Sequence, residues 1–186
     1  MVSGAQQGLL LHTLVRLAKA KRVLEVGCFT GYATLWMALG LPKGGTLLSL
    51  ERDDRCAAVA RRHLDLSGAG EKVELRVGDA LDSIHALSTD EGPFDLAVWR
   101  CSTTQASGTD AQRALLNALI DRLDERSGVL VLLQPPPSAG NSHGMRQECD
   151  AIHDAIAADV SLQVVSLPSP DGDGSLVSCV SRVLAA

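Results

Sequence analysis

Aromatic side chains, basic charge and long apolar stretches are all scarce in this chain of 186 residues. Only 3% of the residues are aromatic, which leaves little material for stacking nucleic-acid bases. The formal net charge of −5 is opposite in sign to that of a typical nucleic-acid binder. No segment approaches the roughly 20 apolar residues that span a bilayer, and the first residues lack the pattern of a signal peptide. Neither nucleic acid nor a membrane is therefore expected as a partner.

Lysine is missing from most of the chain, because the last one is Lys72. Residues 1–76 carry 11 basic and 7 acidic side chains, whereas residues 77–186 carry 6 basic and 15 acidic ones. A mechanism that requires a lysine beyond position 72 is therefore excluded. The five cysteines are odd in number and show no Cys-x-x-Cys spacing, so they predict neither a disulfide framework nor a zinc site. A reduced, cytoplasmic protein is the simplest expectation.

The apolar content, 46% of the residues, is sufficient for the core of one domain, and the length is too small for two. Short apolar runs alternate with amphipathic stretches, which predicts a mostly parallel sheet covered by helices on both faces. The last two runs have no helix between them and should pair antiparallel. Strands are expected at residues 22–26, 46–50, 73–77, 94–99, 129–133, 161–167 and 175–183. Helices are expected at residues 6–19, 32–39, 53–66, 80–87, 110–126 and 145–158, with a proline-rich exposed loop at 134–141.

Polar or glycine residues follow each of the first three expected strands. Gly27 and Gly31 flank the turn after the first strand, where backbone could approach a ligand closely. Glu51 ends the second strand, where similar sheets bond the ribose hydroxyls of an adenosyl ligand. Asp79 and Ala80 follow the third strand, where they would line the adenine. Each feature also has a plain structural interpretation, as turn glycines, a helix start and a helix cap, but all three together favour a nucleoside-type site.

The same residues carry a resemblance to a known family. Leu24-Glu-Val-Gly-Cys-Phe-Thr-Gly-Tyr-Ala33, Leu50-Glu-Arg-Asp53 and Glu71-Lys-Val-Glu-Leu-Arg-Val-Gly-Asp-Ala80 resemble the S-adenosylmethionine-dependent O-methyltransferases of the catechol and caffeoyl-CoA type. The resemblance covers about residues 2–183. It implies a Rossmann-like class I methyltransferase fold, with a seven-stranded, mostly parallel sheet, an antiparallel C-terminal hairpin and helices on both faces. It also implies S-adenosylmethionine as the cofactor and a small-molecule methyl acceptor as the substrate.

The resemblance assigns the cofactor site residue by residue. The methionine end of the cofactor is expected against the first strand and the following turn, the ribose on Glu51, and the adenine beside Arg52. Ala33 replaces the serine usual in the family, and the lost hydroxyl contact is worth about 1 kcal/mol, so binding should persist. The residues expected to bind the cofactor are Ser3, Glu25, Gly27, Cys28, Ala33, Glu51, Arg52, Asp79 and Ala80.

The expected acceptor side departs from the family. Family members carry a metal-binding aspartate and, three residues later, a lysine base after the fourth strand, and an Asp-Asn pair after the fifth. Here Arg100 and Thr103 take the first two places, and Leu133-Gln134 replaces the pair. A guanidinium about 4 Å from a divalent cation costs roughly 8 kcal/mol at an effective dielectric constant of 20. No divalent metal is therefore expected at the family site.

Two functions remain open from the sequence. One is a metal-independent O-methyltransferase in which Arg100 orients an anionic acceptor and His143 or His153 serves as the base. The other is a catalytically inactive S-adenosylmethionine-binding domain that acts as a regulatory or partner subunit. Arg100 also has an interpretation without a functional role, as the partner of Asp95 or Asp79 in a surface ion pair.

The chain begins near the point where the family's usual N-terminal helical segment ends. In the family this segment helps to cover the acceptor and contributes to dimer contacts. We therefore expect residues 1–186 to form a single methyltransferase domain that lacks the segment, either naturally or through truncation, and a homodimer remains an option.

Overall fold

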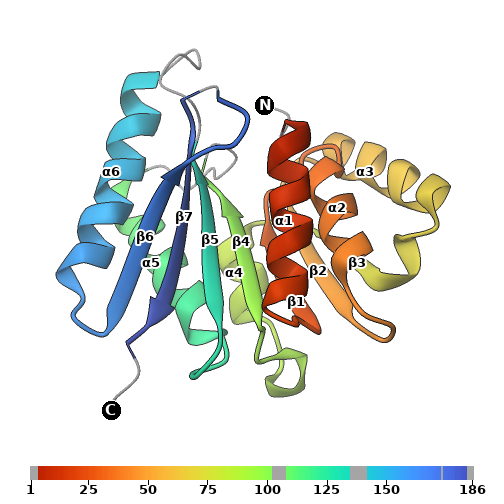
Figure 1. Cartoon of the computed structure of the whole chain (residues 1–186), viewed down its shortest axis with the longest axis horizontal. Coiled ribbons are helices and arrows are strands. Elements are labelled where there is room, and N and C mark those ends of the chain that lie inside the picture. The colour runs from red at the N-terminus through yellow and green to blue at the C-terminus, as the bar shows by residue number, and fades with distance from the viewer. Residues whose placement is uncertain (1–3, 102–107, 135–141, 173, 184–186) are drawn as a thin grey trace.

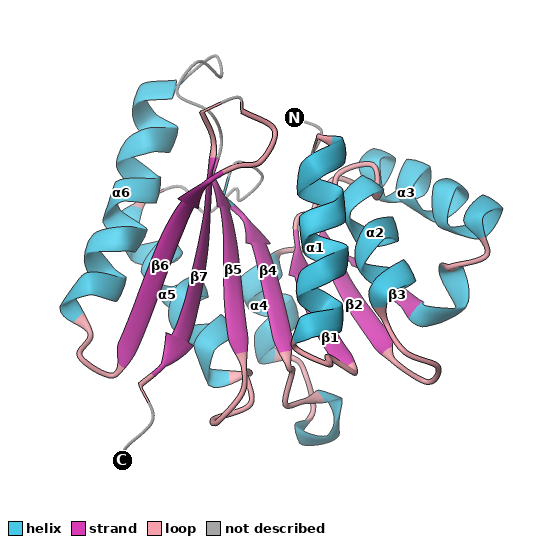
Figure 2. Cartoon of the chain, in the orientation of Figure 1, coloured by secondary structure: helices cyan, strands magenta, loops and turns pink. Residues whose placement is uncertain are grey.

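The structure is a computed structural model, and it describes residues 4–101, 108–134, 142–172 and 174–183, with only the backbone of residues 142–149. Seven strands form one sheet in the order β3-β2-β1-β4-β5-β7-β6 (Figures 1 and 2). The strands are β1 Arg22–Val26, β2 Thr46–Glu51, β3 Val73–Val77, β4 Leu96–Arg100, β5 Val129–Gln134, β6 Leu162–Pro168 and β7 Leu176–Arg182. The first five are parallel, and β7 pairs antiparallel with both β5 and β6. The expected fold is confirmed.

Helices cover both faces of the sheet. The helices are α1 Ala5–Leu17, α2 Tyr32–Gly40, α3 Asp54–Ser67, α4 Ala80–His85, α5 Thr109–Asp121 and α6 Ser142–Ala158, with short 3-10 turns η1 Gly70–Lys72 and η2 Thr89–Glu91. Helices α1 and α2 share a core with one face, and α4, α5 and α6 share a core with the other. In Figure 1, α1 runs down the front of the sheet and α4 and α5 lie behind it. Among the described residues, no helix combines the length and apolarity that crossing a membrane requires.

The alternation of side chains along β4 separates the two cores. Leu96 and Val98 pack toward α1 and α2, whereas Ala97 and Trp99 belong to the core on the other face. Because successive side chains of a strand point to opposite faces, Arg100 follows Leu96 and Val98 onto the face of α1 and α2. From β1 the chain continues to β2 and β3 on one side of the sheet, and from β4 it continues to β5 on the other side. The carboxyl ends of β1 and β4 therefore flank the crevice where sheets of this kind bind ligands.

The main departure from the expected elements is the end of α5. The helix was expected to reach residue 126 but ends at Asp121, because Phe94 and Leu123 form an isolated bridge. The carboxylate of Asp124 then accepts hydrogen bonds from the backbone N–H groups of Arg126 and Ser127, at 3.1 and 2.8 Å, which fixes a turn. For the same reason β4 begins at Leu96 instead of residue 94. Of the loop expected at 134–141, Gln134 is instead the last residue of β5, and residues 135–141 lie outside the described residues.

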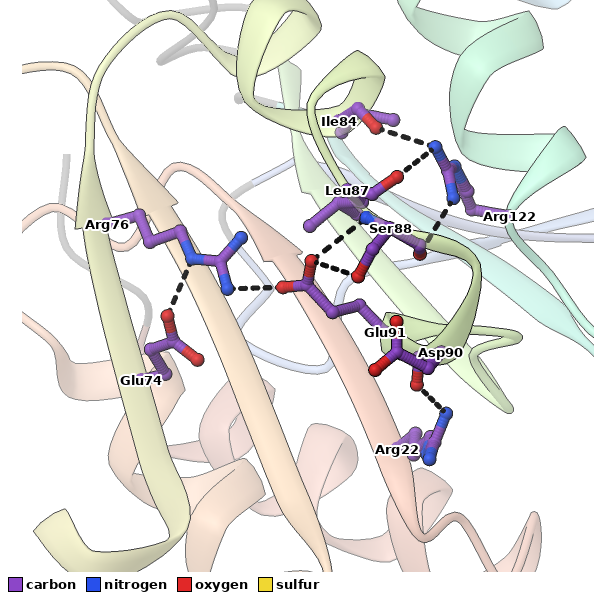
Figure 3. Close-up of polar contacts among 9 residues, drawn as sticks. All are labelled: Arg22, Glu74, Arg76, Ile84, Leu87, Ser88, Asp90, Glu91 and Arg122. Carbon is purple, nitrogen blue, oxygen red and sulfur yellow. Dashed lines mark hydrogen bonds and ion pairs between the residues drawn. The ribbon is translucent and has the colours of Figure 1, made fainter.

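Three arginines hold the connection between α4 and β4 (Figure 3). Arg76 of β3 forms an ion pair with Glu91, whose carboxylate also accepts hydrogen bonds from the N–H and hydroxyl groups of Ser88 at 2.9 and 2.8 Å. Arg122 donates to the carbonyl oxygens of Ile84, Leu87 and Ser88 at 3.1, 2.9 and 3.4 Å. Arg22 donates to the carbonyl oxygen of Asp90 at 2.9 Å. The short 3-10 turn is therefore tied to β1, β3 and the end of α5.

The closing hairpin caps the first helix. Both oxygens of Asp171, from the turn between β6 and β7, accept hydrogen bonds from the N–H groups of Gln6 and Gln7, at 3.0 and 3.3 Å. A Cβ atom on Gly4 would lie 2.2 Å from the Asp171 carboxyl carbon, so this close approach requires glycine. The turn between β6 and β7 thus contacts the N-terminus of α1, although the two are 165 residues apart in the sequence.

Candidate functional site

The turn after β1, where the sequence predicts a close approach of backbone to a ligand, has a left-handed glycine at each end. Gly27 and Gly31 have φ angles of 86° and 84°, in the left-handed region that favours glycine. The N–H of Gly27 donates to the carbonyl oxygen of Leu50 at 2.8 Å, which joins this turn to the end of β2. A Cβ atom on Gly31 would lie 3.0 Å from the Cβ of Ala60, so glycine also permits close packing against α3.

Glu51 lies beside this turn at the end of β2. One carboxylate oxygen accepts a hydrogen bond from the N–H of Phe29 at 2.8 Å, and the other accepts one from the N–H of Asp53 at 3.0 Å. Each oxygen of an ionised carboxylate offers about two acceptor sites, so both can accept a further hydroxyl. The side chain is buried, and the two N–H groups fix its orientation.

Glu25 is the most strongly perturbed acid near the turn. Its Oε2 accepts hydrogen bonds from the hydroxyls of Thr34 and Ser49, at 2.6 and 2.7 Å, and the residue is only 1% exposed. Burial raises the pKa of Glu25 to about 7, although the two hydroxyls and the charge of Arg100 oppose the rise. Sequence reasoning missed Thr34 and Ser49. The signal available was a lone hydroxyl within each of two otherwise apolar runs.

Arg100 is buried, with 7% of its surface exposed, at the carboxyl end of β4. Burial lowers the pKa of its guanidinium, and the charge of Glu25 on the neighbouring strand opposes that effect. A surface ion pair with Asp95 was one expectation, and it is wrong. Asp95 precedes the other end of β4, about 16 Å away at strand spacing, and its carboxylate accepts hydrogen bonds from the N–H groups of Lys21 and Arg22.

Asp79 serves as the N-cap of α4, one of the two roles that the sequence left open. Its carboxylate accepts hydrogen bonds from the N–H groups of Leu81 and Asp82 at 2.9 and 3.2 Å. The surface pairing of Asp79 with Arg100 also fails, since Arg100 is buried and Asp79 is exposed. The N–H of Gly78 donates to the Glu51 carbonyl oxygen at 3.0 Å, so Asp79 and the half-buried Ala80 follow directly beside the end of β2. Arg52 is exposed next to them.

Two further residues of the expected cofactor site belong to the core around α2. Cys28 and Ala33 are both buried, and burial strongly raises the pKa of the Cys28 thiol, which therefore stays protonated. Ser3 and Thr103 lie outside the described residues, and only the backbone of His143 is described.

His153 lies beside the end of β5, and both of its ring nitrogens contact neighbouring side chains. Its Nδ1 lies 3.1 Å from Gln134 Nε2, and its Nε2 lies 3.0 Å from Ser178 Oγ. The Ser178 hydroxyl continues this chain of contacts to Ser166 Oγ at 2.8 Å. Through these contacts His153 orients the Gln134 amide at the end of β5.

Residues 1–103 match the family described as O-methyltransferase. The chain belongs to this family. A catechol O-methyltransferase of Mycobacterium tuberculosis is 34% identical over 181 residues, which are 96% of this chain and 74% of that protein. A catechol O-methyltransferase of Niastella koreensis is 44% identical over 91 residues, and this match spans 48% of the chain and only 41% of that protein. The expected resemblance is thereby confirmed.

A solved O-methyltransferase has the same architecture. TomG from Streptomyces achromogenes, determined in complex with S-adenosylmethionine, is similar with a TM-score of 0.79 and 26% identity. The similarity covers 98% of this chain and 82% of that chain. The seven-stranded sheet with its antiparallel hairpin is therefore shared with a solved O-methyltransferase.

The positions where the resemblance places metal ligands hold no carboxylate in this O-methyltransferase sequence. Arg100 ends β4, and Leu133 and Gln134 end β5 beside it. Across the described parts of the chain, no group of three or more His, Cys, Asp or Glu side chains could hold a metal ion. A buried guanidinium, an alkyl side chain and one amide are a poor donor set for a hard divalent cation, which prefers carboxylate and carbonyl oxygens.

Proposed function

We propose that the chain binds S-adenosylmethionine at the carboxyl ends of β1, β2 and β3 and transfers its methyl group to an oxygen of a small molecule, without a divalent metal. The cofactor part of this proposal is supported by the similarity to a structure solved with S-adenosylmethionine. It is also supported by the left-handed turn at Gly27 and by the oriented carboxylate of Glu51.

The residues of this edge fit such a cofactor chemically. Glu51 would accept hydrogen bonds from the ribose hydroxyls, while Glu25 and the Gly27 turn would face the methionine part, and Arg52, Asp79 and Ala80 would border the adenine. When bound, S-adenosylmethionine supplies a methyl group on a positively charged sulfur, which an oxygen nucleophile can take in a single displacement. The fixed hydrogen bonds to Glu51 keep the site organised before binding, which lowers the entropic cost of association.

The observation that carries the metal-independent part is the burial of Arg100 where the family holds its metal-binding aspartate. A divalent cation about 4 Å from the guanidinium would be destabilised by roughly 8 kcal/mol. The same charge would instead attract a carboxylate or phenolate of the acceptor through a charge-assisted hydrogen bond. It would also favour the ionised form of a phenol, which reduces the need for a general base.

A second function is favoured by the same replacements. Without the family's metal ligands and lysine, the domain could bind S-adenosylmethionine or its product without turnover and act as a regulatory or partner subunit. The two functions share the cofactor site and differ only in the chemistry beside Arg100.

Methyl transfer to a panel of phenols and aromatic carboxylic acids, measured with Mg²⁺ or with EDTA, tests the proposal. We expect product with anionic acceptors at equal rates in both conditions. Turnover that requires Mg²⁺ would contradict metal independence. Cofactor binding without turnover for any acceptor would favour the inactive alternative.

A further inference from the structure

A second concave surface lies at the opposite edge of the sheet from the cofactor residues. It is a groove of about 500 Å³ between the C-terminal ends of α1 and α2. We call it the basic groove, because the cations Arg16, Lys19 and Lys21 line it together with the apolar Val15, Leu39 and Leu41. Lys21 directly precedes β1, whereas the candidate cofactor site lies beyond the other end of that strand. The basic groove is therefore separate from the methyltransferase site.

Close packing of the two helices shapes the basic groove. A Cβ atom on Gly40 would lie 2.8 Å from the carbonyl oxygen of His12 and 3.2 Å from the Cβ of Val15, so glycine lets the end of α2 approach α1. Val15 and Leu41 are buried beneath the groove, and Leu39 is 53% exposed. The groove thus combines a tightly packed apolar floor with an open side.

The helix ends account for only part of the positive charge at its rim. The C-terminus of α1 attracts the positive charge of Arg16 in its last turn. Backbone N–H groups already donate to the carbonyl oxygens of Leu14, Val15 and Arg16, and Lys21 lies outside the helix, directly before β1. At the end of α2, Lys72 Nζ donates to the carbonyl oxygens of Ala38 and Leu41 at 3.1 and 2.7 Å.

Ion pairing does not explain the cations. Among the described residues, the ion pairs involve Arg55, Arg76 and Arg182, and none involves a cation of the basic groove. The nearby carboxylate of Asp95 accepts hydrogen bonds from the backbone N–H groups of Lys21 and Arg22, at 2.7 and 2.8 Å. Three positive side chains therefore border one groove in a protein of net charge −5.

We propose that the basic groove binds a small anion with an apolar body, such as an aromatic or aliphatic phosphate or carboxylate. The volume falls within the range of about 300–1,000 Å³ that is usual for small-molecule sites. The apolar floor would bury the body of the ligand, and the cations at the rim would pair with its acidic group. Because these cations are exposed, binding should weaken as salt is added.

The test uses three matched probes and the full chain labelled with ¹⁵N. Phenyl phosphate and benzoate carry the anionic groups, and benzamide is the uncharged isostere of benzoate. Backbone amide shifts are followed at residues 12–21 and 39–43 and at the carboxyl ends of the strands. We expect the two anions to shift the groove amides in a salt-sensitive way and benzamide to leave them nearly unchanged. The stronger of the two anions identifies phosphate or carboxylate as the natural group.

A variant pair sharpens the result. Arg16→Gln with Lys21→Gln should weaken the binding of the stronger anion about fivefold, as expected for two exposed ion pairs. The matched control, Arg62→Gln with Arg113→Gln on α3 and α5, removes the same charge elsewhere and should leave the affinity unchanged. Three results would each overturn the proposal. Benzamide could shift the groove amides as much as the anions do, the anions could shift amides beside cations all over the surface, or the groove amides of the unmodified chain could show no shift.

Discussion

The ends of β1 and β2 and the ends of β4 and β5 lie on the same sheet but differ in how their side chains are held. At β1 and β2, Glu25 and Glu51 are buried carboxylates with two hydrogen bonds each from neighbouring elements. At β4 and β5, the positions where the resemblance places metal ligands carry Arg100, Leu133 and Gln134. The strands beneath both regions are largely buried and are paired with their neighbours in the sheet. Site chemistry can therefore change at strand ends while the fold that supports them is retained.

The largest expected effect concerns the buried acid of the cofactor side. Glu25 has a pKa of about 7 in the folded chain against 4.5 ordinarily, so the folded state holds a proton that the unfolded state releases between these values. The associated stability is fully present below pH 4.5 and is lost as pH rises through 7, by about 3 kcal/mol in total. Urea unfolding from pH 4.5 to 8 should show this loss, and Glu25→Gln should remove it. A pH dependence unchanged in the variant would contradict this account of Glu25.

The next largest effect is a loss of cofactor-product affinity when Glu51 is changed. Glu51→Gln keeps the size of the side chain but turns an amide NH₂ toward backbone N–H groups and removes charged hydrogen bonds worth about 2 kcal/mol. Calorimetry should show S-adenosylhomocysteine binding about 30-fold more weakly. Glu74→Gln, an exposed change on β3, is the matched control and should bind normally. If both variants bound S-adenosylhomocysteine with equal affinity, Glu51 would not be part of the cofactor site.

Substitutions of Arg100 test the proposed binding of the methyl acceptor at the end of β4. Arg100→Met keeps an unbranched apolar stem and removes the charge, so methyl transfer to anionic acceptors should fall about tenfold in kcat/KM, while S-adenosylhomocysteine affinity changes little. Arg100→Lys should recover part of the loss, because an ammonium group still pairs with an anion. Neutral acceptors provide the internal comparison. A uniform loss for charged and neutral acceptors would show that Arg100 acts on the structure instead of the acceptor.

The smallest effect concerns the contact between the β6–β7 turn and the N-terminus of α1. Asp171→Ala removes a cap from the N-terminus of α1 and should lower the free energy of unfolding by about 1 kcal/mol. Asp171→Asn should lose less, since asparagine is also a good cap. Thermal unfolding of both variants measures the difference. Equal stability of the alanine variant and the unmodified chain would show that the hairpin does not stabilise the helix.

Local sequence pattern was sufficient for most of the fold. Apolar runs and glycine or proline breaks located all seven strands to within two residues, and the missing helix before the last strand indicated the antiparallel hairpin. The end of α5 was missed because it depends on a bridge between Phe94 and Leu123, and helix periodicity carries no information about such a distant contact.

The candidate site was predictable only in part. Glu51 and the glycine turn follow directly from motif spacing, and the structure brings them together. Thr34 and Ser49 were missed because their bonds to Glu25 depend on how α2 and β2 pack against β1. The burial of Arg100 could not be predicted either, since exposure depends on neighbouring strands and not on the residue's own position in the sequence.

Calorimetric titration of S-adenosylmethionine in EDTA and in excess Mg²⁺, with Mg²⁺ alone as a third titration, tests the contrast between the two regions most directly. The account predicts one cofactor bound per chain, with the same affinity in both buffers, and no heat from Mg²⁺ alone. Absence of cofactor binding, or stoichiometric binding of Mg²⁺ to the chain, would contradict it.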